Sequence, residues 1–253
     1  MPVITSPQAS AWTFAYSPGT RHYQISRSAA IESRSDSGST HETSTNFTYE
    51  LVALTSAGDS EISFTAAVDT FSTTTQGLIG RVQSIQLPVQ VRGLLASHSL
   101  TFNTDSSISS KCNPVTSTLI SDLHSLLTPF PVQLSQGMAW RDSVDSSGCQ
   151  AGIPTSSRTI RSYIVSGEAK YEGRLVLLVQ RSDSIQAHGE GAQQQHPLKL
   201  DAIGTGSGVY YLDTKDGRII RITTGQELNL TITMSAKAHQ FKQTSSQDFR
   251  LMP

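Results

Sequence analysis

Polar and apolar residues alternate along most of this 253-residue chain. The clearest case is a pair of segments on either side of a turn at residues 55–59. Their apolar residues are Phe47, Tyr49, Leu51 and Ala53 before the turn, and Ile62, Phe64, Ala66 and Val68 after it. A period of two predicts antiparallel strands that are packed on one face and wet on the other.

Similar patterns predict further strands before and after the middle of the chain. They lie at residues 12–16, 21–31, 79–95 with a break at Pro88, 100–103, 160–165, 174–179, 184–188, 198–203, 209–213, 218–222 and 228–234. Asp216-Gly217 is typical of a tight hairpin turn. Residues 32–44 and 189–196 are expected to be loops, because they are rich in Ser, Gly and Gln.

One segment has a helical period instead. Its apolar residues are Leu119, Ile120, Leu123, Leu126 and Leu127, which fall on one side of a helix. Thr116 or Ser117 can cap its start, and Pro129 with Pro131 ends it. We therefore expect an amphipathic helix over 116–127. After it, Trp140 is expected to bring the chain back into the core.

The two cysteines, Cys112 and Cys149, bracket this helix. A disulfide between them would close a loop of about 38 residues and contribute roughly 4 kcal/mol on the chain-entropy model. Two free buried thiols are the alternative. The spacing has none of the clustering that a zinc site requires.

Taken together, the patterns predict a mainly β protein: a long antiparallel meander, either one curved sheet or two packed sheets, around one central amphipathic helix. The expected organisation is an extended arm (1–11), one β-rich domain (12–243) and a tail (244–253). Within the domain, halves at 12–111 and 150–243 would be joined by the 112–149 helix segment.

Composition limits the classes of partner and the cellular location that we expect for this protein. Charged residues make up 15% of the chain and the net charge is −1, which gives no electrostatic footprint for nucleic acid or an anionic membrane. Ser and Thr together are roughly a quarter of the residues, well above their usual share. No stretch approaches the roughly 20 apolar residues of a membrane-spanning helix. The first residues lack the apolar region of a signal peptide. We expect a mature exported chain, periplasmic or extracellular, in preference to a cytosolic protein.

The sequence offers little for catalysis. The seven histidines lack metal-ligand spacing, and no Gly-x-Ser-x-Gly elbow is present. Gly204-x-Gly206-x-Gly208 lacks the spacing and the following helix of a phosphate loop, so it indicates a glycine-rich strand or bulge. Asp142 and Asp145 are interpreted as a solvated turn in preference to a calcium or acid–base site. We expect no catalytic residue, cofactor or metal.

Three segments carry a resemblance to a protein group. They are Pro129-Phe-Pro with Gly137, Trp140 and Asp142; Arg161 with Tyr163 and Gly167; and the stretch from Gly208 to Gly217-Arg218. They resemble uncharacterised exported bacterial proteins, often lipoproteins, built from antiparallel sheets. The resemblance covers the central and C-terminal half. It implies export and the fold class but no activity, and this chain departs from the lipoprotein members because it has no lipobox cysteine.

The expected function is non-enzymatic. We expect an accessory or structural subunit on the outer face of a membrane complex, for example a photosynthetic or respiratory assembly, with protein partners that include integral membrane proteins. Phe249, Leu251 and Met252 in the tail are the predicted partner-binding residues. The alternative is a periplasmic carrier that holds a lipid or another apolar ligand in a curved sheet, and a hydrolase is a distant third.

Overall fold

The computed structural model describes residues 11–33, 40–56, 61–76, 89–96, 99–103, 114–150, 153–193, 196–235 and 237–253. In these residues the chain forms one long meander with one helix. The elements in order are β1 (Ala11–Thr13), β2 (Gly19–Ser33), β3 (Thr40–Ser56), β4 (Ile62–Gln76), β5 (Val89–Ala96), β6 (Ser99–Asn103), α1 (Pro114–Leu126), β7 (Gln133–Ser135), β8 (Ala139–Gln150), β9 (Ile153–Tyr171), β10 (Arg174–Gln193), β11 (His196–Asp213), β12 (Arg218–Met234) and β13 (Lys237–Leu251).

Eleven of the strands form one antiparallel sheet in the order β6-β5-β4-β3-β2-β13-β12-β11-β10-β9-β8. Neighbours in the sheet are also neighbours in the chain except at one place, where β13 returns to pair with β2 and joins the two halves. The predicted mainly β meander is therefore confirmed, as a single large curved sheet. A second sheet contains only β1 and β7.

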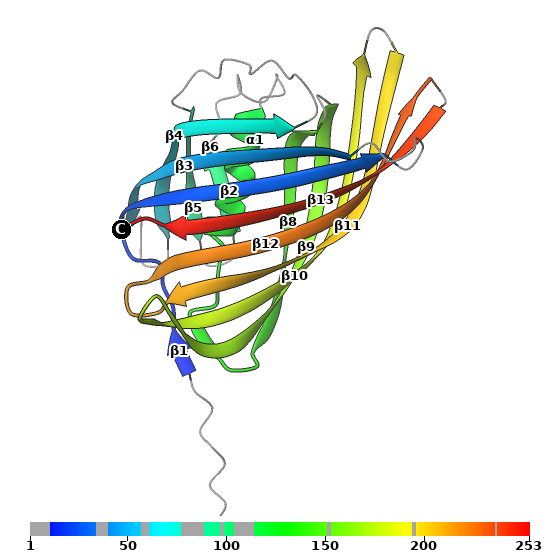
Figure 1. The fold of residues 1–253 in the computed structure, drawn as a ribbon. Coiled ribbons are helices and arrows are strands. Elements are labelled where there is room, and N and C mark those ends of the chain that lie inside the picture. The colour runs from blue at the N-terminus through cyan, green and yellow to red at the C-terminus, as the bar shows by residue number, and fades with distance from the viewer. Residues whose placement is uncertain are drawn as a thin grey trace, which may run out of the picture.

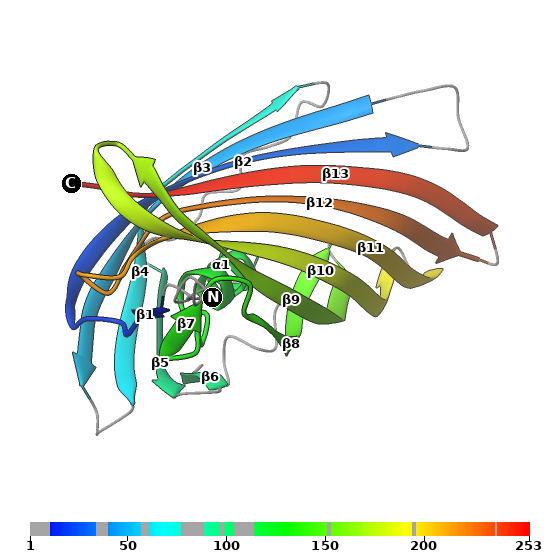
Figure 2. The ribbon, with the colours of Figure 1, turned by 90° about the horizontal axis from the view of Figure 1, so that it is seen from below.

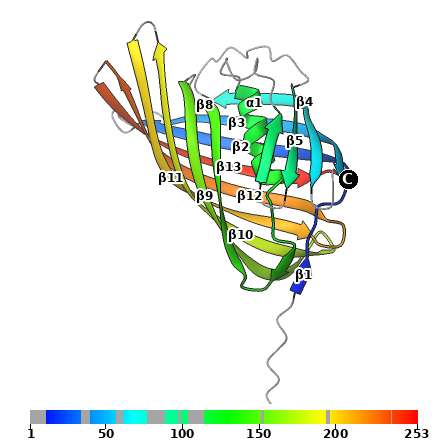
Figure 3. The same cartoon turned by 180° about the vertical axis from the view of Figure 1, so that it is seen from behind.

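The sheet bends strongly, and α1 lies on its concave side (Figure 1). Viewed from behind, the helix occupies the space between β8 on one side and β5 on the other (Figure 3). It packs against β8, β5 and β12. The long strands on the β10 and β11 side extend well beyond the helix (Figure 2). The sheet thus has a part that the helix covers and a part that projects past it.

The helix begins at Pro114 and ends at Leu126, close to the predicted 116–127. Proline suits the first position of a helix because its missing N–H would have no intrahelical partner there. Leu119, Leu123 and Leu126 are almost completely buried, and they face the sheet as the sequence period predicted. Burial of such side chains contributes about 1.5–3 kcal/mol each, so packing on the sheet is what holds the helix.

The Pro-Phe-Pro segment after the helix supplies the centre of the core. The ring of Phe130 makes edge-to-face contacts with four aromatic rings from distant parts of the chain. These rings, with their centroid distances, are Phe14 at 5.5 Å, Trp140 at 6.0 Å, Tyr163 at 6.2 Å and Tyr210 at 5.2 Å. Trp140 also stacks on Tyr163 at 5.0 Å. The predicted return of Trp140 to the core is confirmed, since it packs against this cluster.

Several predicted loops are strands in the structure. Residues 189–193 and 196 belong to β10 and β11, whose hairpin is far longer than the predicted strands. Residues 40–44 belong to β3, and Asp142 with Asp145 lies within β8 instead of in a turn. Conversely, β1 stops at Thr13, so the predicted strand 12–16 is too long at its C-terminal end. The run before Pro88 lies outside the described residues.

Candidate functional site

Alternation gives the sheet two faces with different roles. On β9 and β10, odd-numbered residues such as Tyr163, Val165 and Val179 are buried in the main core, while even-numbered residues such as Ile164 and Gln180 are exposed. We call the face that carries the core and α1 the inner face, and the opposite one the outer face. The described residues line a hollow on each face.

Beneath the helix, the inner face is polar and charged. Arg161 of β9 is 5% exposed and donates to both carboxylate oxygens of Asp142 on β8, at 2.7 and 2.5 Å. Its third nitrogen, Nη1, donates to the main-chain oxygen of His124 at 2.7 Å. That oxygen belongs to the last turn of α1, where carbonyls lack intrahelical partners. One arginine therefore neutralises a carboxylate and holds the end of the helix.

Other groups hold the same end of the helix. Tyr16 donates through its hydroxyl to the oxygen of Thr128 at 2.9 Å, and Thr128 donates to the oxygen of Ser125 at 3.1 Å. On the helix itself, Arg27 of β2 forms an ion pair with Asp122. Burial lowers the pKa of His124 to about 4, and the nearby positive charge of Arg161 adds to the effect. The His124 imidazole is therefore neutral at pH 7.

A cavity of about 100 Å³ lies between the helix and this polar part of the sheet. The helix contributes Ser121, His124 and Ser125, and the sheet contributes Arg181 and Asp183 among others. Arg181 forms an ion pair with Asp183, with 2.9 Å between Nη2 and Oδ2, and its Nη1 donates to the hydroxyl of Tyr210 at 2.8 Å. Both charged side chains are more than nine-tenths buried.

The glycine run borders this charged pair. Gly206 lies in β11, as the prediction of a glycine-rich strand requires, and directly opposite Asp183 in the register. A Cβ atom on Gly206 would lie 3.0 Å from Asp183 Oδ2 and 3.2 Å from the oxygen of Gly225. Such contacts are tighter than most Cβ atoms make, so glycine favours the close approach of the strands to the buried carboxylate.

The outer face carries a much larger hollow, a groove of about 780 Å³ across β8 to β13. Two rows of outward side chains border it, because the register places them opposite one another from strand to strand. The first row is Asp145, Arg158, Gln186, Ile203 and Asn229, and the second is Ser147, Ser156, His188, Asp201, Thr231 and Gln240. The row between them, which includes Ala187, Ala202 and Leu230, has its side chains on the inner face. Its main chain forms the floor of the groove.

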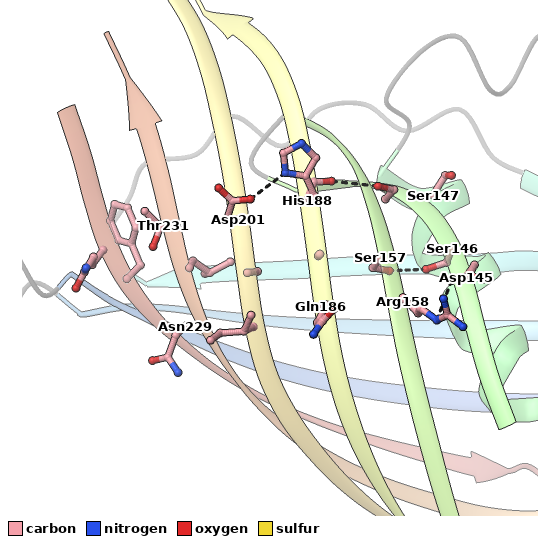
Figure 4. Close-up of a pocket in the computed structure, with 17 residues that line it drawn as sticks. Asp145, Ser146, Ser147, Ser157, Arg158, Gln186, His188, Asp201, Asn229 and Thr231 are labelled. Atoms are coloured by element: carbon pink, nitrogen blue, oxygen red, sulfur yellow. Dashed lines mark hydrogen bonds and ion pairs between the residues drawn. The ribbon is translucent and has the colours of Figure 1, made fainter. Parts of the chain in front are cut away.

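Charges of both signs line the groove (Figure 4). His188 Nδ1 lies 2.9 Å from Asp201 Oδ1, and both side chains are about half exposed. This hydrogen bond raises the pKa of His188 and lowers the pKa of Asp201. Arg158 lies 3.8 Å from Asp145 at the β8 end. Ile203, 63% exposed, is the apolar member of the two rows.

The predicted partner-binding residues are not in a tail, which corrects the predicted limit of the domain at residue 243. Residues 244–251 continue β13, and Phe249 is 0% exposed because its side chain packs in the core beside Ile25. Leu251 is partly buried against the same core. Met252 is 41% exposed, but its main-chain N–H donates to the oxygen of His22 at 2.8 Å. Phe249 therefore cannot reach a partner. The predicted arm lies mostly outside the described residues.

The cysteine prediction is untested. Cys112 lies outside the described residues, and for Cys149 they include the main chain, which pairs with Pro154 in β8 and β9. The Cys112–Cys149 disulfide therefore stays a prediction.

The sequence reasoning overlooked the residues that now line both hollows. Arg161 and Asp142 were noted as motif residues, but their pairing depends on the β8–β9 register. His188 and Asp201 lie 13 residues apart in the predicted strands 184–188 and 198–203, but the sequence did not define the register that places them opposite each other. The sequence signal that could have found part of the groove was the alternation in 198–203, which places Asp201 and Ile203 on the solvent-exposed face.

No group of three His, Cys, Asp or Glu side chains among the described residues could hold a metal ion. In the described part of the chain, no helix combines the length and the apolar character of a membrane span.

No protein-family model and no curated protein matches the sequence. Among solved structures, the chain is similar to a Bacteroides fragilis protein described as exported and as having a YmcC-like fold. The identity is 10%, the alignment covers 96% of this chain and 100% of that one, and the TM-score is 0.32. It is also similar to OccK2 (OpdF) of Pseudomonas aeruginosa, with 6% identity, 92% and 98% coverage and a TM-score of 0.29. An outer membrane channel of Pseudomonas putida has 8% identity, 95% and 97% coverage and a TM-score of 0.24. Identities and TM-scores this low carry no argument about function.

Proposed function

We propose that this protein is a non-enzymatic extracytoplasmic protein that acts by protein–protein contact, as an accessory subunit of a cell-envelope or membrane complex. The observation that carries the proposal is the groove of about 780 Å³ on the outer face of the sheet. Strands β8 to β13 form it, so a rigid element supports every side chain along it.

The side chains of the groove suit a protein partner. Specific interfaces combine a few buried anchors with a polar rim that forms hydrogen bonds and ion pairs. Ile203 offers an anchor in the middle of the groove, and the Asp145–Arg158 and His188–Asp201 pairs offer charge of both signs on either side. Charges arranged in this way contribute more to orientation and choice of partner than to raw affinity.

Transport of an apolar ligand has less support. Pockets for lipid-sized or drug-sized ligands enclose roughly 300–1,000 Å³ and are mostly apolar. The cavity beside the helix encloses about 100 Å³, and charged and hydroxyl side chains line it. The Leu face of α1 and the aromatic cluster around Phe130 occupy the space where a carrier would hold its ligand.

We assign no reaction to His188 and Asp201. Both side chains are about half exposed, and their hydrogen bond joins directly opposed residues of two adjacent strands. Opposite charges in that arrangement are an ordinary source of cross-strand stability. The high Ser and Thr content supports a location outside the cytoplasm.

Site-specific photo-crosslinking in the cells that make the protein tests the proposal. A benzophenone side chain replaces Gln186 in the groove or, as the matched control, Gln180, which is also exposed on the outer face of β10. We expect Gln186 to crosslink to one defined envelope protein and Gln180 not to. Arg158→Glu should weaken that adduct. Equal adducts from the two positions, or none from either, would refute the groove as a contact surface.

A further inference from the structure

Strand β8 forms one end of the eleven-stranded sheet (Figure 3). All twelve of its residues, Ala139–Gln150, pair with β9 without a register shift, and none of them is proline. Bulges, prolines and very short strands are common devices that keep the edge of a sheet from pairing with another chain. The strand at the other end of the sheet, β6, has only five residues. β8 is therefore the edge of this sheet that can best accept a further strand.

The main-chain groups of alternate β8 residues point toward that edge. The oxygen of Met138 accepts from the N–H of Val165 on β9 at 2.9 Å. Because the direction of N–H and C=O alternates along a strand, even-numbered residues of β8 bond to β9, and the odd-numbered residues within 139–147 face away from it. The helix packs on the inner side of the strand, where Val144 and Ser146 line the cavity beside it. Among the described residues, no main-chain hydrogen bond joins another segment to the edge.

The side chains on the outer face decide which strand fits the edge. Water can satisfy exposed main-chain groups, so the open edge alone identifies no partner. The odd-numbered side chains are Ala139, Arg141, Ser143, Asp145 and Ser147, and all five are exposed. Arg141 and Asp145 lie two residues before and two residues after Ser143. A second copy of the strand, antiparallel and centred on Ser143, therefore places each Arg141 opposite an Asp145.

This charge match selects one register. No other register that pairs the odd-numbered residues with one another places Arg141 opposite Asp145. Two of the alternatives place Arg141 or Asp145 opposite its own copy, and like charges directly opposite each other are destabilising. Charged side chains usually discourage pairing at the edge of a sheet. On β8 they favour a second copy of the same strand in a single register.

We propose that two copies of this protein associate through antiparallel pairing of their β8 strands about a twofold axis at Ser143, with Arg141 of each copy forming an ion pair with Asp145 of the other. The odd-numbered residues exchange main-chain hydrogen bonds across the contact, and the two sheets become one continuous sheet. The contact uses the same surface of both copies, as a twofold axis requires. The inference does not rest on the proposed function of the outer groove.

Sedimentation equilibrium of the full-length protein tests the association. A contact of one strand from each copy is small, so we expect a reversible dimer with a dissociation constant of about 10 μM. Arg141→Asp opposes aspartates across the contact and Asp145→Arg opposes arginines, so each variant alone should dimerise at least tenfold more weakly. An equal mixture of the two variants should recover the parent affinity, because the mixed dimer regains both ion pairs. Arg174→Asp, at the exposed start of β10, is the control and should dimerise like the parent.

Cross-linking locates the axis. Ser143→Cys should give a covalent dimer with a short bismaleimide, and Ser184→Cys, exposed on the outer face of β10, should give no more than the parent protein. A monomer at every concentration up to about 1 mM would overturn the proposal. A dimer that both charge variants leave unchanged, or a mixture no tighter than either variant alone, would refute the pairing of Arg141 with Asp145. Equal cross-linking from positions 143 and 184 would refute the axis at Ser143.

Discussion

Replacement of Arg161 by methionine should destabilise the protein far more than an ordinary surface substitution. Methionine keeps the length and much of the apolar bulk of the side chain but removes every donor. The Asp142 carboxylate, with 21% of its side chain exposed, would lose its bidentate partner, and the oxygen of His124 would lose the bond that holds the end of α1.

The magnitude follows from these two losses. Removal of one partner from a buried ion pair costs about 3–5 kcal/mol, because the other charge stays buried without compensation. The lost hydrogen bond to the helix carbonyl adds about 1–2 kcal/mol, although Asp142 retains some contact with solvent. We expect a loss of about 4 kcal/mol in the free energy of unfolding. For a chain of this size that corresponds to a melting temperature lower by about 8–16 °C.

The same strand supplies a matched control. Arg158 also belongs to β9 and directly opposes an aspartate of β8, Asp145, but this pair lies on the outer face with side chains 64% and 75% exposed. Exposed pairs contribute roughly 0–1 kcal/mol. Urea unfolding followed by tryptophan fluorescence, with a common slope, should therefore show almost no change for Arg158→Met.

A double variant isolates the ion pair. Asp142→Leu in the Arg161→Met background removes the orphaned carboxylate, so it should recover about half of the loss. Equal costs for Arg161→Met and Arg158→Met would refute the reasoning, since burial is the difference between the two sites. A double variant no more stable than Arg161→Met would assign the cost to the helix end.

Three further predictions concern acid, backbone strain and thiols. Burial lowers the pKa of His124 from 6.5 to about 4, so as the pH falls the unfolded state takes up a proton on this residue before the folded state does. The free energy of unfolding should therefore fall by up to about 3 kcal/mol between about pH 6.5 and pH 4. Urea unfolding of His124→Gln should lack that part of the pH dependence. Gly217 has φ +57, and a Cβ atom there would lie 2.0 Å from the main-chain oxygen of Ala15. Gly217→Ala should therefore lower the free energy of unfolding, measured by thermal unfolding, by about 2–4 kcal/mol. Gly137→Ala is the control: its φ is +79 but the space around it is open, so the loss should be about 1 kcal/mol. Alkylation without reductant should leave Cys112 and Cys149 unmodified by mass spectrometry, and two labelled thiols would exclude the disulfide.

Local signals were sufficient for elements whose inner face is apolar. The Leu period predicts α1 to within two residues at each end, and alternation predicts β3 and β4 on either side of the turn expected at residues 55–59. Asp216-Gly217 marks the β11–β12 turn because glycine there adopts a positive φ. For α1 and β4 the pattern reports packing against the main core.

Strands with polar inner faces were missed for a physical reason. In β13 the inward residues include Gln243, Ser245 and Gln247, and Gln247 lines the polar cavity. An inner face of this kind looks like a solvated tail in the sequence. In β10, Gly189 and Gly191 lie against Ile153 and contribute no side chain to the pattern. The groove was equally hidden, because its rows exist only once six strands are in register.

The pairing of β13 with β2 has a consequence for the order of events in synthesis. β2 is among the first strands to leave the ribosome and β13 is the last of the described ones, yet they lie side by side in the middle of the sheet. Until β13 emerges, β2 and β12 are unpaired edge strands of two separate half-sheets. Unpaired edge strands can form backbone hydrogen bonds with other chains and aggregate. Such a nascent chain is expected to depend on a chaperone that shields those edges. Loss of β13 would leave two half-sheets with unpaired, aggregation-prone edges instead of one shortened sheet.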